Sequence, residues 1–217
     1  MANNKTDYEI NIVHLYPDLL NLYGDRGNIA CMEKRLKWRG IKANVYTCTN
    51  KDHSIDLKTA DIIFVGGGSD REQEIVCSLL LKKKEEIKEY VENGGTVVAT
   101  YLLGYVDEST LCWLGGFPGD GLREVFGVTA SELDTLYPGE GNRAIWVKSS
   151  QQSSIKDYCE LWQPAEGTEV VAVYGQDFYS GHAAVTHHVF GKGHTYYIGA
   201  RLDDAGNAAV LRAALAD

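Results

Sequence analysis

Residues 60–73 read ADIIFVGGGSDREQ and carry the clearest structural signal in the chain. An apolar run of strand length leads directly into three glycines and then into a polar segment that suits a helix. Gly66, Gly67 and Gly68 allow the backbone to turn sharply, so that amide N–H groups point toward the C-terminal edge of a parallel sheet. The stretch therefore predicts a buried strand, a tight loop and a helix, in that order.

The same alternation of strand and helix extends over the first half of the chain. It predicts a doubly wound, mainly parallel α/β sheet of the flavodoxin-like type, with a strand order near 2-1-3-4. The expected strands are 8–16, 42–48, 60–68 and 96–101, and the expected helices are 28–40 and 70–93, with a break near 81–84.

The second half is richer in strands, and it adds mostly antiparallel ones. FGKGH at 190–194 is typical of a hairpin turn between two β-rich runs, because its glycines accept positive φ. We expect a short helix at 122–127, strands at 128–137, 143–149, 158–165, 169–175, 182–190 and 194–201, and a closing helix at 203–216. Nothing resembles a linker, so residues 1–217 are predicted to form one domain.

Composition excludes several classes of function. The net charge of -9 argues against nucleic acid and anionic membranes as partners, because no basic segment stands out from the acidic background. No apolar run reaches the length of a membrane span, and no export signal is visible, so we expect a soluble cytoplasmic protein. A dinucleotide fingerprint is absent, and no cofactor is predicted.

The glycine loop is the strongest candidate site. Its amides and Arg71 have the chemistry to hold a carboxylate or phosphate, as a remnant oxyanion or anion loop. The alternative is a tight loop in which Ser69 or Asp70 caps the next helix. A second segment, YGDRGN at 23–28, leaves the same choice between a polar-ligand site and helix capping. The predicted ligand-binding residues are Gly66, Gly67, Gly68, Asp70 and Arg71.

The thiols and imidazoles indicate no catalytic or metal centre. The five cysteines are scattered without a CxxC pair, and none is at a strand-to-helix elbow, so we expect reduced, inert thiols. Cys31 and Cys77 are expected on the core faces of helices. His187 and His188 are adjacent in a strand and should face opposite sides, while His182 and His194 flank the hairpin. The remaining cysteines are Cys48, Cys112 and Cys159.

The first half resembles a known family. The segments LYPDLLNLYGDRGNI, ADIIFVGGGSDREQ and EYVENGGTVVA are similar to the glutaminase subunit of bacterial lipid II isoglutaminyl synthase, a class I glutamine amidotransferase-like protein. This resemblance covers residues 8 to about 100. It implies that Gly66–Gly68 would contribute oxyanion contacts, and that the strand ending near residue 100 would continue into a nucleophilic cysteine.

The second half resembles a different family. TYLLGYVDESTLCWLGGFPGDGLREVFGV, YGQDFYSGHAAVT and FGKGHTYYIGARLDD are similar to the trimerisation domain of family-42 β-galactosidases. The resemblance implies a related α/β fold that packs subunits into a trimer and contains no catalytic barrel. At the corner where the first family has its cysteine, this chain has Tyr101.

Together the resemblances predict a chimera with halves 1–100 and 101–217, joined near 98–101. We interpret it as an engineered recombination, because natural fusions usually join whole domains. Its expected function is that of an α/β scaffold without catalysis, because the nucleophile is absent. The alternatives are an oligomerisation module that keeps trimer contacts and a glutaminase that uses another thiol such as Cys112. Either a monomer or a trimer is compatible with the sequence.

Overall fold

A computed structural model describes residues 8–21, 24–51, 55, 57–69, 71–72, 75–76, 79, 84–105, 111–119 and 121–216. The chain contacts divide it into two compact units, Met1–Ile87 and Lys88–Asp217. Each unit is considered by itself, and a single domain over 1–217 stays a prediction.

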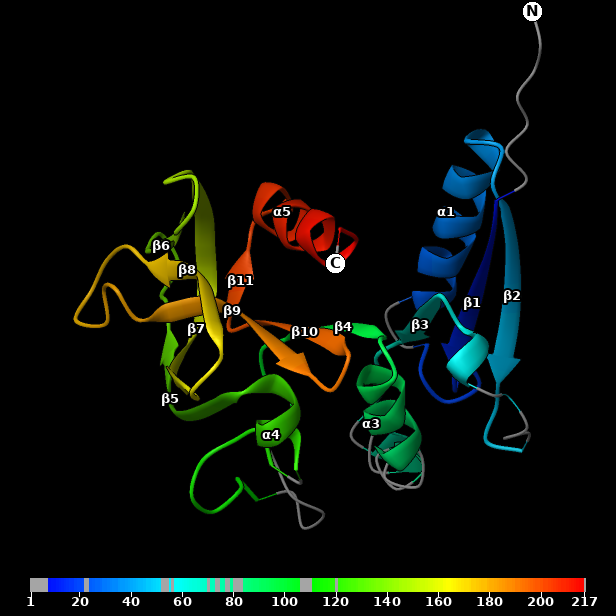
Figure 1. The fold of residues 1–217 in the computed structure, drawn as a ribbon, viewed down its shortest axis with the longest axis horizontal. Helices are drawn as coiled ribbons and strands as arrows, with labels where there is room; N and C mark the ends of the chain where they lie inside the picture. The colour runs from blue at the N-terminus through cyan, green and yellow to red at the C-terminus, as the bar shows by residue number, and fades with distance from the viewer. Residues whose placement is uncertain are drawn as a thin grey trace, which may run out of the picture. The chain divides into compact units, whose positions relative to one another are not determined.

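The first unit is built on a parallel sheet with the order β2-β1-β3. Its strands are β1 (Glu9–Leu15), β2 (Lys42–Cys48) and β3 (Ile62–Val65), joined by α1 (Asp25–Trp38) and a 3-10 helix (Leu57–Thr59) (Figure 1). The central strand β1 is the most deeply buried, and Ile12 and Leu15 are fully enclosed. The expected strands and helix are confirmed here, with α1 beginning at Asp25 and not at residue 28.

The second unit contains a mixed eight-stranded sheet. Its path runs β11-β7-β6-β8-β9-β10-β4, and β5 pairs with β7. The strands are β4 (Thr96–Thr100), β5 (Val128–Thr135), β6 (Asn142–Trp146), β7 (Gln152–Pro164), β8 (Glu169–Tyr174), β9 (Ala183–Phe190), β10 (Gly193–Ile198) and β11 (Ala200–Leu202). The helices are α3 (Lys84–Glu92), which begins before the unit boundary, α4 (Leu122–Phe126) and α5 (Asp204–Ala214).

The predicted hairpin is present, and its second strand also pairs in parallel with an earlier strand. β9 and β10 pair antiparallel, and Gly191 in the turn between them has φ 64°. β10 then pairs in parallel with β4, with Tyr196 opposite Val98. The α/β class with a parallel sheet is therefore confirmed. The doubly wound, flavodoxin-like arrangement stays a prediction, since β4 was expected as the fourth strand of the first sheet and belongs to the second.

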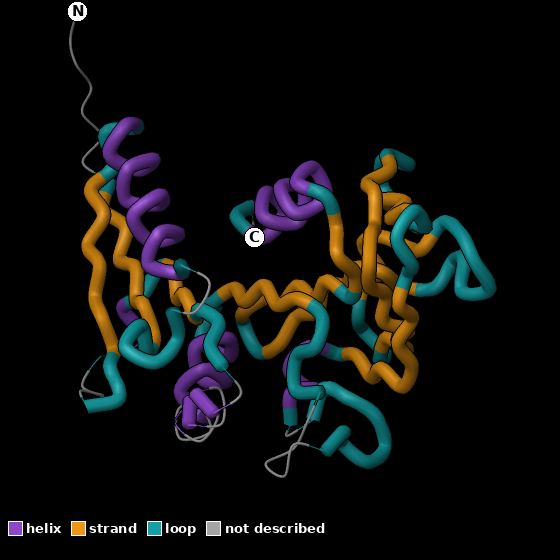
Figure 2. Tube along the Cα trace, turned by 180° about the vertical axis from the view of Figure 1, so that it is seen from behind, coloured by secondary structure: helices purple, strands orange, loops and turns teal. Residues whose placement is uncertain are grey.

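Two apolar clusters lie on opposite faces of the second sheet. On one face Tyr196 and Ile198 pack with residues of α5, and on the other Tyr197 and Trp162 pack with residues of α4. Figure 2 shows α4 and α5 on opposite sides of the β4–β10 strands. Side chains alternate along β7, so Glu160 shares the α4 side with Trp162. This alternation places a carboxyl group inside an aromatic cluster.

No helix in the described part of the chain is both long enough and apolar enough to cross a membrane.

Candidate functional site

The glycine loop after β3 packs tightly against the start of α1. A Cβ atom on Gly66 would lie 2.7 Å from Cγ of Asp25 and 2.9 Å from the carbonyl oxygen of Leu20, so a side chain has no room there. The N–H of Gly67 donates to Oδ2 of Asp25 at 3.2 Å. Asp25 is buried, and its carboxylate therefore occupies the position from which an external anion would meet this amide.

The end of the same loop is also bonded internally. Ser69 donates from its N–H and its hydroxyl to Oε2 of Glu72, at 2.9 and 2.8 Å. These bonds hold the pKa of Glu72 below its usual value, and the bond from Ser69 N–H matches one of the two bonds of a capping box. The Ser69 hydroxyl donates to Glu72, so capping of the next helix by this side chain stays a prediction. Asp70 lies outside the described residues.

Gly66, Gly67 and Gly68 lie in one loop, and Arg71 is exposed in the helical segment that follows it. The amides of Gly67 and Ser69 already donate to carboxylates of this chain. An anion would have to displace Asp25 or Glu72 to use them. Anion binding by this loop stays a prediction, with sulfate titration followed by amide chemical shifts as its test.

The corner after β4 has its strained backbone at Leu102 and not at Tyr101. Leu102 has φ 67°, a left-handed conformation that costs free energy for a leucine. In enzymes with a nucleophile elbow, the reactive residue occupies such a strained position at the strand end. Here the position holds an alkyl side chain. Tyr101 instead packs its ring against Tyr158, with centroids 5.0 Å apart.

The amide of this corner is bonded to a buried carboxylate. Leu102 N–H donates to Oε1 of Glu160 at 2.7 Å, while Trp162 Nε1–H and the Tyr197 hydroxyl donate to Oε2 at 3.2 and 3.0 Å. Burial raises the pKa of Glu160 to about 6, although these donors act in the opposite direction. In hydrolases, amides at such a corner stabilise an oxyanion. In this chain the Leu102 N–H donates to the Glu160 carboxylate instead.

Sequence reasoning missed Glu160. It stands in YCELWQ within β7, and a lone carboxylate between apolar neighbours in a strand is a usable signal. The signal identifies a buried acid but not its partners, because Leu102 is 58 residues away in the chain.

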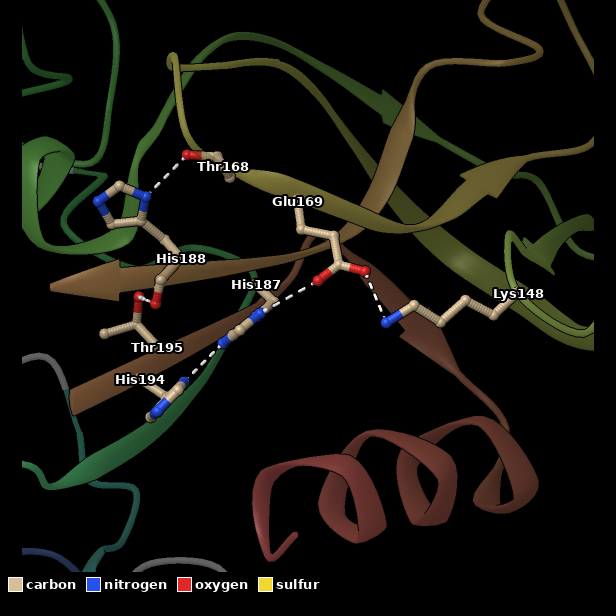
Figure 3. Close-up of polar contacts among 7 residues, drawn as sticks. All are labelled: Lys148, Thr168, Glu169, His187, His188, His194 and Thr195. Atoms are coloured by element: carbon tan, nitrogen blue, oxygen red, sulfur yellow. Dashed lines mark hydrogen bonds and ion pairs between the residues drawn. The ribbon is translucent and has the colours of Figure 1, made fainter. Parts of the chain in front are cut away.

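His187 and His194 belong to a row of polar side chains on the face of the β9–β10 hairpin opposite to that of Tyr197. Lys148 Nζ lies 2.9 Å from Oε1 of Glu169, whose Oε2 lies 3.4 Å from Nδ1 of His187. Nε2 of His187 is 2.8 Å from Nδ1 of His194, and the two ring planes differ by 8° (Figure 3). One hydrogen lies between these nitrogens, so their lone pairs do not converge on a metal ion.

The opposite orientation of the adjacent histidines is confirmed. Nδ1 of His188 lies 3.0 Å from Oγ1 of Thr168, away from the row that contains His187 (Figure 3). His182 is exposed and precedes β9. Within the described residues, no three His, Cys, Asp or Glu side chains gather as a set that would hold a metal ion.

The described cysteines are free thiols in different environments, and their inertness stays a prediction. Cys48 and Cys159 are buried, and burial raises the pKa of Cys159 to about 11, which keeps it a neutral thiol. Cys31 is exposed, so its expected core position was wrong, because the buried stripe of α1 runs through Asp25 and Ile29. Cys112 is exposed and its side chain is hydrogen-bonded to Tyr105. Cys77 lies outside the described residues.

The fold and this corner define an α/β protein that is related in part to glutamine amidotransferases. Residues 11–100 match the CobB/CobQ-like glutamine amidotransferase domain, and residues 77–217 match the β-galactosidase trimerisation domain. The chain belongs to the β-galactosidase trimerisation domain family. Both resemblances of the sequence are confirmed, and the two matches overlap over residues 77–100.

Curated relatives and solved structures agree with this family. A β-galactosidase from Alicyclobacillus acidocaldarius is 45% identical over 129 residues, which cover 56% of this chain and 18% of the relative. One from Clostridium perfringens is 44% identical over 127 residues, covering 55% and 18%. The crystal structure of the cold-adapted β-galactosidase from Rahnella sp. R3 matches with a TM-score of 0.64 and 29% identity, over 95% of this chain and 31% of that one.

A β-galactosidase structure from Bacillus circulans sp. alkalophilus gives a TM-score of 0.63 and 25% identity, over 95% of this chain and 30% of that one. This chain thus spans about a fifth of the curated relatives and about three tenths of the solved chains. The structural match extends over both halves, including the amidotransferase-like residues.

Proposed function

We propose that the chain is a non-catalytic α/β scaffold of the trimerisation-domain family. The observation that carries the proposal is the bond between Leu102 and Glu160. An alkyl side chain stands at the strained corner, and the corner amide donates to the protein's own carboxylate at 2.7 Å. Neither a nucleophile nor an unbonded oxyanion donor is then present at this position, and acyl transfer needs both.

The scaffold is proposed to be an engineered chimera joined within residues 98–101. In support, the two family matches overlap over 77–100, and their descriptions name different protein families. Solved β-galactosidases match about 95% of the chain, so the amidotransferase-like half fits the same fold. Exchange between two related folds preserves the sheet that both halves need to bury their apolar faces.

Glutamine-dependent ammonia release tests the absence of catalysis. We expect no release above the buffer rate from the whole chain, and the same result from Cys112→Ala. Release by the parent chain that is lost in Cys112→Ala would overturn the proposal in favour of a glutaminase that uses this exposed thiol. Release that persists in Cys112→Ala would also overturn it and would indicate a different nucleophile.

A second candidate function is assembly. The matched family is described as a trimerisation domain, and large apolar side chains are exposed on loops of the second unit, such as Leu114, Tyr137 and Phe178. Aromatic anchors of this kind are typical of protein interfaces. Light scattering at several concentrations distinguishes a 24.0 kDa monomer from a species of three times that mass. A monomer at every concentration rules assembly out.

A further inference from the structure

Glu160 joins three separate segments of the second unit through one carboxylate. Its donors come from the turn after β4, from β7 itself and from β10. The side chain has no exposed surface. The carboxylate is therefore a fixed structural junction, and any change in its charge acts on all three segments at once.

The three groups that donate hydrogen bonds to this carboxylate are neutral: a backbone amide, an indole and a phenol. Within the described residues, no ion pair includes Glu160. The titratable groups that its charge affects are the hydroxyls of Tyr105, Tyr158, Tyr174 and Tyr197. Each has its pKa raised, so all four stay protonated when the carboxyl group titrates.

Charged groups on the neighbouring elements have other partners. Asp134 on β5 accepts from the Tyr179 hydroxyl, and Arg123 on α4 donates to the carbonyl oxygens of Pro118 and Gly116. Glu124 on α4 lies 3.7 Å from Lys88, and His188 on β9 contacts Thr168. His188 lies on the same face as Tyr197, since Thr186 is opposite Tyr197 in the β9–β10 register. Burial lowers the pKa of its imidazole below the ordinary histidine value, and the test below has to separate its titration from that of Glu160.

The hydrogen bond that holds the Leu102 amide should change in strength with the charge of Glu160. A leucine with φ 67° persists only where its surroundings hold it there, and a hydrogen bond to an ionised acceptor is about twice as strong as one to a neutral acceptor. Protonation of the carboxyl group weakens all three bonds. Burial places this protonation near pH 6, within the range in which proteins are handled.

We propose that Glu160 is a proton-operated latch on the turn formed by residues 101–105: the carboxylate holds Leu102 in its left-handed conformation, and the neutral acid releases it. The latch controls the shape of the corner that a nucleophile elbow would occupy in an amidotransferase. It requires neither a ligand nor assembly, so it is independent of the proposed scaffold function.

Proton–nitrogen NMR spectra of the whole chain between pH 7.5 and 5.0 test the latch. We expect the Leu102 amide and the Trp162 indole resonances to move upfield together with one midpoint near pH 6. Hydrogen-exchange protection of the Leu102 amide, corrected for the intrinsic rate, should fall about tenfold over the same range. Resonances that stay in place across this range would overturn the proposal.

Two variants test whether the pH-dependent change of the resonances belongs to Glu160. Glu160→Gln should remove it, whereas His188→Gln should leave it intact, because His188 is bonded to Thr168 and not to the carboxylate. A transition that persists in Glu160→Gln, or disappears in His188→Gln, contradicts the latch. If Glu160→Gln does not fold, Tyr197→Phe serves instead. Loss of that donor should move the midpoint to higher pH, and an unchanged midpoint counts against the proposal.

Discussion

The Leu102 amide and the Glu160 carboxylate are 2.7 Å apart, although 58 residues separate them in the chain. One belongs to the turn that ends β4 and the other to the middle of β7. Their hydrogen bond helps to hold Leu102 in its strained conformation, and it also gives the buried carboxylate a donor. A buried carboxylate and a left-handed leucine are each unfavourable alone, and here each compensates in part for the other.

Stability should depend on pH through Glu160. Its pKa is about 6 in the folded protein against an ordinary value of 4.5, so the folded state binds the proton more tightly. This contribution is full below pH 4.5 and is lost as pH rises through 6, by about 2 kcal/mol. Urea unfolding of the parent chain and of Glu160→Gln at several pH values measures the difference. A parent minus variant difference that does not decline from pH 4.5 to 7 would contradict the assignment.

Removal of the Tyr174 hydroxyl should destabilise the second unit. This oxygen lies 2.9 Å from the carbonyl oxygens of both Glu160 and Gly199, and it accepts from Glu160 N–H at 3.1 Å. Glu160 N–H and the Gly199 carbonyl oxygen also bond to each other at 2.7 Å, so Tyr174→Phe removes only the bonds of the hydroxyl itself. The substitution should cost about 0.5–1.5 kcal/mol in urea unfolding. Tyr137→Phe is the control, because Tyr137 is 76% exposed and its loss should be close to neutral.

Gly199 should tolerate no side chain. A Cβ atom there would lie 1.8 Å from the ring of Trp162, which also donates to Glu160. Gly199→Ala should therefore cost about 1–3 kcal/mol or more by overpacking, measured by thermal or urea unfolding. Gly27 in α1 has open space around it, so Gly27→Ala should be neutral or stabilising through helix propensity. Equal effects of the two substitutions would contradict this packing.

Asp203 should contribute more to the stability of α5 than its neighbour Asp204 does. Oδ1 of Asp203 accepts from Gly206 N–H and Oδ2 from Ser154 N–H, both at 2.8 Å, which lowers its pKa. Asp203→Ala should cost about 0.5–2 kcal/mol of unfolding free energy, the usual loss for an N-cap. Asp204→Ala removes a charge from the first turn without removing the cap. If Asp204→Ala costs as much as Asp203→Ala, the cap is not the source of the effect.

Local patterns in the sequence predicted the local structure well. The apolar run of β3, the glycines of the β9–β10 turn and the closing helix all depend on residues close in the chain, and all appear where expected. The opposite orientation of His187 and His188 follows from the two-residue period of a strand. Such features depend on backbone geometry and neighbouring side chains, which a short stretch of sequence specifies by itself.

Cys31 shows where local pattern is insufficient. Its helix was predicted, but the face of α1 that is buried depends on how the helix packs, and Cys31 is exposed. The membership of β4 in the second sheet was missed for the same reason, because the residues of a strand do not determine which strand it pairs with.

The sequence by itself determined the types of element, the hairpin and the two families that its halves resemble. Only the tertiary structure decided that Leu102 occupies the strained corner and that Glu160 meets its amide. Elements arise from interactions between residues close in the chain, whereas this junction arises when β4, β7 and β10 come together and bury a charge among them.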